Sequence, residues 1–365
     1  MGALSESLSI VTELFEPNIG GQENRFARFA ELLAARGRPV TVYTSDHTGG
    51  TLPTRTVTNG VEVVRYTRLR RYVRNGSRGL LPLLRYWIAT RRLLRTLARR
   101  GGPVWINQMP VAHLLGTAPA PGMGIDWCEY PTDWKIDRIA RRLVRRWRHG
   151  TAVSQIVSDH LRGIRRDLDL EVVRTPVAIP SDPSPPRQEG TIVYVGRIVA
   201  HKNLGALAEA VRELHGNGGP HPRLLVAGDG PDRPALERTY GGSEQVRFLG
   251  RVSEAEKQRL IRSAWLLAIP GTREGYPTVA AEANVYGTPL LASGSALNSA
   301  GEFIRANDVG TVASGVHAAD FVEALRGIDN SSWERWRVAS TRLRSLYDPT
   351  TNVRRLEGAI GRWAN

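Results

Sequence analysis

Two glutamates eight positions apart have the spacing that most directly suggests chemistry in this sequence. Glu274 and Glu282 flank the segment 275–281, in which Gly-Tyr-Pro is a turn signal and Thr-Val-Ala-Ala can begin a helix. The short apolar run 265–270 precedes them and is typical of a buried strand. The predicted order is therefore strand, loop and helix, with Glu274 at the carboxyl end of the strand and Glu282 inside the helix.

This arrangement suits one class of ligand. Ligands of open parallel sheets bind outside the carboxyl ends of the strands. The backbone N–H groups of residues 275–278 would lie at a helix N-terminus, which favours an anion. Backbone amides can bind phosphate, and carboxylates can bind hydroxyl groups. Together they fit a polyhydroxylated ligand that carries phosphate. The alternative interpretation is that one glutamate caps the helix and the other lies solvated on its surface.

Two cations share another expected strand–helix loop. Arg197 and Lys202 are five positions apart, directly after the predicted strand 191–195. Arginine offers a planar fork and lysine a point charge, a pairing that suits diphosphate. Two solvated cations are the alternative. However, this loop and those of Arg251 and Glu274 all follow strands, so we expect them on one side of a sheet, which favours a site.

Length and composition limit the possible classes of protein. The 365 residues exceed one ordinary hydrophobic core, and 41% hydrophobic content is that of a globular protein, so two domains are expected. The single cysteine, Cys128, excludes an internal disulfide and is compatible with a reducing cytoplasm. The sequence shows neither a signal peptide nor an apolar run of membrane-spanning length, which predicts a cytoplasmic protein.

The charge is strongly basic and uneven. The net charge is +15, and the segment Arg65–Arg100 holds twelve arginines and no acidic residue. Such a balance indicates nucleic acid, a membrane surface or an anionic substrate as partner. Two expected helices, 80–97 and 135–147, mix leucine and tryptophan with arginine as interfacial helices do, so peripheral contact with the inner face of a membrane is one interpretation. Solvated helix faces are the other.

Strands and helices alternate along both halves of the chain, which indicates an α/β protein. The Pro-rich segment 181–190 is the clearest linker. We predict one Rossmann-like domain over residues 1–182 and a second over residues 187–345, facing each other across a cleft. Residues 346–365 are expected to form a helix that packs back on the N-terminal domain.

One loop of the first half combines acids with aromatic rings. The segment 126–134 holds three of each in nine residues and follows the strand candidate 123–125. Carboxylates bind sugar hydroxyls and aromatic faces bind sugar C–H surfaces, so an acceptor site is plausible. Its candidate residues are Trp127, Glu129, Tyr130 and Asp133. The alternative is a loop held in the core by its aromatic side chains.

The second half carries an ordered set of short motifs: Val195-Gly196-Arg197, His201-Lys202-Asn203, Gly228-Asp229-Gly230-Pro231, Phe248-Leu249-Gly250-Arg251-Val252, Arg273-Glu274-Gly275-Tyr276-Pro277, Glu282-Ala283 and Gly287-Thr288-Pro289. In this order they resemble the signature of retaining family-4 glycosyltransferases. In the first half, Gly20-Gly21-Gln22-Glu23 and Ala152-Val153-Ser154 also match. The resemblance implies the GT-B fold, which consists of two Rossmann-like domains.

The resemblance also implies roles for the motif residues. Arg197 and Lys202 would hold the diphosphate of a nucleotide-sugar donor, Glu274 would contact the transferred sugar, and Glu282 would bind the ribose hydroxyls. The remaining donor-binding residues would be Gly20 and Gly21 over the phosphates, Arg251 and Val252 beside the base, and Gly275, Tyr276, Pro277 and Thr278 around the sugar and distal phosphate. Members of the family need no metal or other cofactor, and the sequence shows no metal-ligand spacing. The donor, UDP- or GDP-linked, is a co-substrate.

The sequence departs from the family pattern at two places. Many members carry a histidine in a loop of the first domain near the sugar, and the nearest equivalent here is Asp126, which becomes a catalytic candidate. The Gly-Gly that often follows the Gly-Thr-Pro strand is replaced by the segment 293–296. Both departures leave the donor sugar and the acceptor open.

The resulting hypothesis is a retaining, metal-independent hexosyltransferase that acts on an acceptor hydroxyl. The acceptor would be a small natural product or a cell-envelope glycan or lipid. Paired carboxylates would also suit a glycosidase, and the fold a GT-B phosphorylase, although no residue resembles a pyridoxal-phosphate lysine. A basic protein that binds nucleic acid or a membrane surface without catalysis is the non-enzymatic alternative. The sequence does not indicate an oligomeric state.

Overall fold

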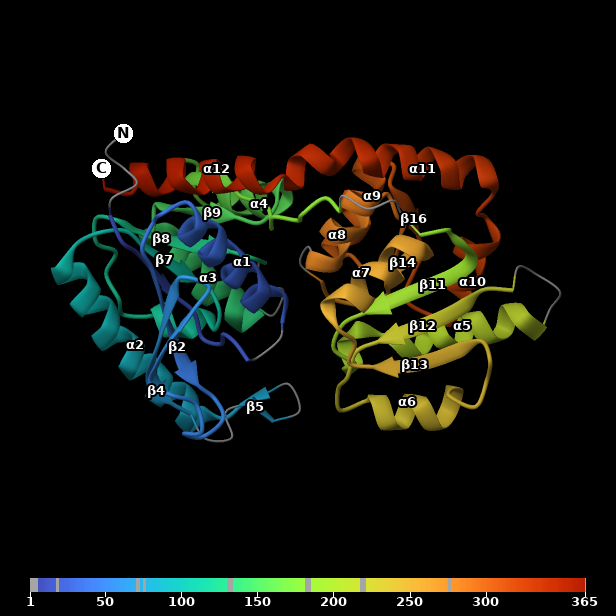
Figure 1. The fold of residues 1–365 in the computed structure, drawn as a ribbon, viewed down its shortest axis with the longest axis horizontal. Helices are drawn as coiled ribbons and strands as arrows, with labels where there is room; N and C mark the ends of the chain where they lie inside the picture. Colours follow the sequence, from blue (N-terminus) through green and yellow to red (C-terminus); the bar gives the residue numbers. More distant parts are fainter. Residues whose placement is uncertain are drawn as a thin grey trace. The chain divides into compact units, whose positions relative to one another are not determined.

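The computed structural model describes residues 6–17, 20–69, 73–74, 77–129, 134–180, 185–216, 221–274 and 277–364. The chain forms two compact units (Figure 1). The first consists of Met1–Pro176 together with Pro349–Asn365, and the second of Val177–Asp348. The chain therefore passes between units at residues 176 and 177 and returns at residues 348 and 349, whereas the sequence placed the boundary in the linker 181–190.

The first unit is built on an eight-stranded sheet in the order β10-β9-β8-β7-β1-β2-β4-β3. Its strands are β1 (Leu8–Val11), β2 (Val40–Asp46), β3 (Arg55–Thr58), β4 (Val61–Arg68), β7 (Val104–Asn107), β8 (Met123–Trp127), β9 (His149–Ala152) and β10 (Asp169–Val172). All neighbours pair in parallel except β3, which pairs antiparallel with β4 at the sheet edge. A separate short hairpin joins β5 (Val73–Arg74) and β6 (Ser77–Arg78).

Helices cover both faces of this sheet. Buried side chains of α2 (Leu80–Arg100), α3 (Trp134–Arg146) and α4 (Gln155–Ile164) share one hydrophobic cluster with the strands. Buried side chains of α1 (Gly21–Ala35) and α12 (Pro349–Arg362) share another. The remaining element is a short 3-10 helix, η1 (Val111–Leu114). The unit thus has the helix–sheet–helix layering of a doubly wound fold.

The C-terminal helix α12 is part of the first unit. Its residues Val353, Leu356, Ile360 and the following Trp363 are buried in the same cluster as β1, β2 and α1. The Trp363 ring lies so close to Gly124 of β8 that a Cβ there would stand 2.5 Å from a ring carbon. A glycine is therefore needed at this position for the indole to pack against the sheet.

The second unit contains a six-stranded parallel sheet in the order β13-β12-β11-β14-β15-β16. Its strands are β11 (Gln188–Val195), β12 (Arg223–Ala227), β13 (Val246–Gly250), β14 (Ala264–Ile269), β15 (Leu290–Ala292) and β16 (Gly310–Val312). Its helices are η2 (Ala200–Lys202), α5 (Leu204–Gly216), α6 (Arg233–Tyr240), α7 (Glu254–Ser263), α8 (Thr278–Tyr286), α9 (Ser299–Asn307), α10 (Ala318–Arg326), α11 (Asn330–Arg342) and η3 (Leu343–Tyr347). Helices α5 and α10 bury their apolar side chains against one face of the sheet.

Both sheets reverse their strand order at an internal pair. In the first, this pair is β1 and β7, and in the second it is β11 and β14. The loops that leave the carboxyl ends of such a pair run to opposite sides of the sheet, which opens a crevice for ligands. No helix in the described part of the chain is long and apolar enough to cross a membrane.

Candidate functional site

The cationic loop and the glutamate loop meet at the reversal point of the second sheet. The loop after β11 contains η2, and the loop after β14 leads into α8. The carbonyl of His201 accepts hydrogen bonds from the N–H of Thr272 at 2.8 Å and from its hydroxyl at 3.3 Å. These bonds hold the two loops side by side, so the sequence correctly predicted that both end strands on the same side of one sheet.

Lys202 and Glu274 form a close ion pair across these loops. Lys202 Nζ lies 2.6 Å from Glu274 Oε1 and 2.7 Å from Oε2. The Lys202 side chain is 22% exposed and that of Glu274 only 9%. The backbone of Glu274 is also fixed, because its N–H donates to the carbonyl of Leu297 and its carbonyl accepts from Ser299. Both groups are therefore oriented before any ligand binds.

Further positive charge surrounds this pair. The pKa of His201 is lowered to about 4, first by burial and then by the charges of Lys202, Arg273 and Arg197. A neutral imidazole at pH 7 follows. Arg197 and Arg273 are exposed at the surface. Three cations near one imidazole make this end of the sheet a place where an anion is favoured.

Glu282 is buried inside the unit. It is 2% exposed, and its Oε1 accepts a hydrogen bond from Lys257 Nζ at 2.8 Å. Lys257 also pairs with Glu254 at 2.9 Å. The burial excludes the interpretation that Glu282 is a solvated residue on a helix surface. Its carboxylate is held by a lysine of the neighbouring helix α7.

Three loops at the carboxyl ends of β11, β12 and β13 stack on one another through their backbones. Gly228 has φ 147°, and a Cβ built there would lie 1.9 Å from the carbonyl oxygen of Gly196. A Cβ at Gly230 would lie 2.1 Å from the carbonyl oxygen of Ile198. The N–H of Ile198 donates to the carbonyl of Asp229 at 2.9 Å. These close approaches require glycine and fix the loop that carries Arg197.

The remaining expected donor-binding residues of the second unit lie at the same edge of the sheet. Arg251 follows β13, is 78% exposed and has its Nε 3.6 Å from Asp229 Oδ2. Val252 is half-buried. Pro277 is the N-cap residue of α8, and Thr278 is the first residue of that helix. Gly275 and Tyr276 lie outside the described residues.

Sequence reasoning missed an asparagine that supports the glutamate loop. Asn298 Nδ2 donates at 3.0 Å to the carbonyls of both Ile269 and Gly271, and at 3.1 Å to the hydroxyl of Ser293. Asn298 lies just beyond the segment 293–296, which replaces the glycine pair of the family pattern. The sequence held no signal for this role, because the partners of the amide are mostly backbone carbonyls.

In the first unit, Gly20 and Gly21 lie where β1 leads into α1. Gly20 is the N-cap residue and Gly21 the first residue of the helix. Both glycines thus lie at the junction between a strand and a helix.

Asp126 is fully buried in a network of hydrogen bonds. Arg25 of α1 binds both of its carboxylate oxygens at 2.9 Å. Thr151 donates to Oδ1 at 2.5 Å and Cys128 to Oδ2 at 3.1 Å. Burial opposes the charge on Arg25, but Asp126 outweighs it, so the pKa of Arg25 is raised. This geometry argues against the expected role of Asp126 at the sugar, because both oxygens are engaged inside the unit.

Of the four expected acceptor residues, the structure describes Trp127 and Glu129. Trp127 is 2% exposed and packs in the hydrophobic core, as the alternative interpretation of this loop had it. The carbonyl of Glu129 accepts from Gln108 Nε2, and its N–H donates to Gln108 Oε1. Tyr130 and Asp133 lie outside the described residues.

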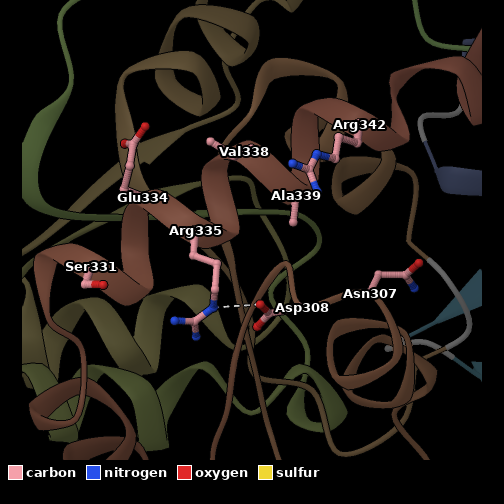
Figure 2. Close-up of a pocket in the computed structure, with 8 residues that line it drawn as sticks. All are labelled: Asn307, Asp308, Ser331, Glu334, Arg335, Val338, Ala339 and Arg342. Carbon is pink, nitrogen blue, oxygen red and sulfur yellow. Dashed lines mark hydrogen bonds and ion pairs between the residues drawn. The ribbon is translucent and has the colours of Figure 1, made fainter.

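A separate hollow of about 610 Å³ lies elsewhere on the second unit (Figure 2). It is lined by Asn307, Asp308, Ser331, Glu334, Arg335, Val338, Ala339 and Arg342. Arg335 and Asp308 form an ion pair across it at 2.7 Å. Asp308 precedes β16, so this hollow is at the amino ends of the strands, opposite the Lys202–Glu274 pair. Within the described ranges, no group of three or more His, Cys, Asp or Glu side chains could hold a metal ion.

Comparison with known proteins agrees with this geometry. Residues 179–337, which make up most of the second unit, match the family described as glycosyl transferases group 1. The whole chain superposes on a sucrose-phosphate synthase from Thermosynechococcus elongatus with a TM-score of 0.76, covering 98% of each chain at 16% identity. The second unit thus matches a glycosyltransferase family over residues 179–337, and the chain has the GT-B fold. The predicted family and fold are thereby confirmed.

Two further proteins are similar to this chain, one in sequence and one in structure. The D-inositol 3-phosphate glycosyltransferase of Mycobacterium tuberculosis is 31% identical over 162 residues, which is 43% of this chain and 32% of that protein. This chain thus matches only about a third of the length of such curated relatives. Anabaena HepE in complex with UDP and glucose superposes with a TM-score of 0.71 at 16% identity, covering 98% of this chain and 100% of HepE.

The stacked loops predict that substitution of two glycines of the second unit by alanine will have very different effects on stability. Gly228→Ala should destabilise this GT-B unit by on the order of 3 kcal/mol, because the new Cβ would collide with a carbonyl oxygen at an unfavourable φ. Gly242→Ala is the control, since a Cβ there meets no atom within 4 Å. Chemical denaturation of both variants measures the difference. Equal stability would show that the loops do not need this close approach.

The buried network predicts a structural role for Asp126. Asp126→Asn should destabilise the first unit by about 3–5 kcal/mol, since it leaves Arg25 charged and buried without its partner. The double variant Arg25→Met, Asp126→Leu should recover much of this loss, because it removes both charges. Denaturant unfolding checks both values. A double variant that folds well but has no glycosyl transfer would instead support a catalytic role for Asp126.

Proposed function

We propose that this chain transfers a hexose from a nucleotide-diphospho-sugar to an acceptor hydroxyl, with retention at the anomeric carbon and without a metal ion. The observation that carries the proposal is the Lys202–Glu274 pair at the reversal point of the second sheet, with Arg197 and Arg273 beside it. The match of the second unit to a glycosyltransferase family gives the reaction class. The bound UDP and UDP-glucose in solved HepE structures support a donor of this kind.

The proposed roles follow from charge and position. Arg197 and Lys202 bind the diphosphate, aided by the positive end of the helix dipole at the N-terminus of α8. Glu274 binds the sugar that is transferred, and the buried Glu282 binds the ribose hydroxyls. Arg251 and Val252 lie beside the base. The backbone of Pro277 and Thr278 frames the sugar and the distal phosphate.

Catalysis would come from stabilisation of the leaving group. The bond between the anomeric carbon and the diphosphate oxygen breaks, a bond to the acceptor oxygen forms, and the proton of the acceptor hydroxyl passes to the departing diphosphate oxygen. Negative charge grows on the diphosphate during this step. Lys202 and Arg197 interact more strongly with that charge than with the bound donor, which is the condition for catalysis.

The ion pair in the ligand-free protein has a consequence for this mechanism. The ammonium of Lys202 keeps the carboxylate of Glu274 oriented, and Glu274 keeps the long lysine side chain in place. When a diphosphate arrives, Lys202 can contact it while Glu274 turns to the sugar hydroxyls. The pair therefore preorganises both groups in a partly dry site, where such contacts are strongest.

The proposal predicts a large loss of turnover when either partner is removed. Lys202→Ala and Glu274→Gln should each lower kcat about 100- to 1,000-fold, as expected for the loss of one preorganised electrostatic contact. Glycosyl transfer is measured with nucleotide-sugars that raise the melting temperature in a thermal-shift screen.

The matched controls are Glu209→Gln and Arg212→Ala, which remove an exposed ion pair on α5 of the same unit. They should leave kcat close to the wild-type value. Near wild-type turnover in both the Lys202 and Glu274 variants, with folding intact, would exclude the proposed site.

His201 provides a second test through its pKa. Binding of UDP should raise this pKa from about 4, because the diphosphate offsets the cations that lower it. The NMR shifts of His201 across a pH titration, with and without UDP, measure the change, and His160 of the first unit serves as internal control. An unchanged His201 pKa with UDP bound would place the diphosphate elsewhere.

The imidazole of His201 also makes the stability of the fold depend on pH. Its pKa falls from 6.5 to about 4 on folding, so the unfolded chain binds a proton that the folded chain does not. This contribution to stability is therefore complete above pH 6.5 and is lost as the pH falls towards 4.

A further inference from the structure

The helix α2 of the first unit has a second apolar face. Its buried side, formed by Tyr86, Leu94 and Leu97, packs on the sheet. Four further large apolar residues of this helix are exposed instead: Leu80 (85%), Leu81 (74%), Leu84 (49%) and Ile88 (38%). A surface helix ordinarily places polar residues there, so a contiguous exposed apolar stripe marks an interaction site.

Helix geometry puts these residues on one side. Leu80, Leu84 and Ile88 follow one another at intervals of four positions, which aligns them along the helix axis. Leu81 lies beside them. At 100° per residue, this stripe points well away from the buried residues of the same helix. Figure 1 shows α2 along the outside of the first unit.

Positive charge continues the stripe towards the end of the helix. Arg92, Arg95 and Arg99 are exposed and lie on the same side as Leu84 and Ile88. The segment Arg65–Arg100, to which the helix belongs, contains twelve arginines and no acidic residue. Apolar side chains for an acyl layer and guanidinium groups for phosphate headgroups thus lie on one helix face.

The other arginine-rich helix differs. In α3, Ala140, Leu143 and Val144 are buried in the core. Among its described side chains, one large apolar residue, Ile136, is exposed (38%), together with Arg138, Arg142 and Arg145. This helix has the charge of α2 without its exposed leucines. It is therefore an ordinary basic surface helix and provides an internal control.

We propose that α2 docks the protein on an anionic lipid bilayer, with Leu80, Leu81, Leu84 and Ile88 inserted at the interface. Charge complementarity selects an anionic surface, and the apolar stripe selects a bilayer over nucleic acid, which offers phosphate but no acyl layer. The binding is peripheral and reversible. The proposal does not depend on the glycosyltransferase activity.

The test measures co-sedimentation of the full chain with vesicles of phosphatidylglycerol and phosphatidylcholine, and with phosphatidylcholine alone. The wild type should bind the anionic vesicles at low salt and bind the zwitterionic ones much more weakly. The variant Leu80→Gln, Leu84→Gln, Ile88→Gln should lose at least about tenfold in affinity at unchanged charge. Val57→Gln, an exposed apolar residue of β3, should bind like the wild type.

A pair of charge variants separates docking through α2 from general attraction. Arg92→Gln, Arg95→Gln, Arg99→Gln should lose on the order of 100-fold in affinity, since each arginine near the surface contributes about fivefold. Arg138→Gln, Arg142→Gln, Arg145→Gln removes the same charge from α3 and should lose far less. Melting temperatures and UDP binding of all variants confirm that they are folded.

Several outcomes would overturn the proposal. These are a wild type that does not bind anionic vesicles at low salt, a leucine variant that binds like the wild type, and equal losses for the α2 and α3 charge variants. Salt-dependent binding to duplex DNA, unaffected by the leucine variant and without vesicle binding, would assign the basic surface to nucleic acid. Because UDP binding is measured separately, failure of docking and failure of the proposed function are distinguishable.

Discussion

The backbone contact between the loops after β11 and β14 is the constraint on which the candidate site depends. These strands are neighbours in the sheet although about seventy residues separate them in the chain. The hydrogen bonds from Thr272 to the carbonyl of His201 bring Lys202 and Glu274 within reach of each other. Without this contact, the cations of one loop and the carboxylate of the other would be independent surface charges.

Further contacts hold these two loops in place within the second unit. Gly228 and Gly230 let the loop after β12 stack on the backbone of the residues next to Arg197, and Asn298 binds the carbonyls that precede Glu274. The charged residues themselves are long and partly exposed. Their positions are fixed by backbone atoms and small residues, which makes the charge arrangement insensitive to the flexibility of the side chains.

The sequence predicted where Lys202 and Glu274 lie in the second unit because the signals around them are local. Strand, turn and helix signals around Glu274 and around Lys202 place both residues at strand ends, and parallel strands end on one side of a sheet. The buried state of Glu282 and the role of Asn298 could not be predicted in this way. Both depend on partners, Lys257 and the carbonyls of residues 269 and 271, that are far away or carry no side-chain signal.

The first unit was harder to interpret for the same reason. Asp126 and Trp127 have the composition of a sugar-binding loop, but their environment is set by Arg25 and Thr151, which come from a distant helix and strand. Composition alone does not distinguish a buried ion pair from a ligand site. The antiparallel edge strand β3 also gave no clear pattern, since its residues are mostly exposed and lack the alternation of a half-buried strand.

The return of the chain to the first unit has a consequence for biosynthesis. Val353, Leu356, Ile360 and Trp363 complete a core whose other members come from residues 8–173. The first unit therefore cannot finish packing until the ribosome has made the residues up to Trp363, whereas the second unit is contiguous and can close on itself earlier. In this protein, the domain that is translated first is the one that matures last.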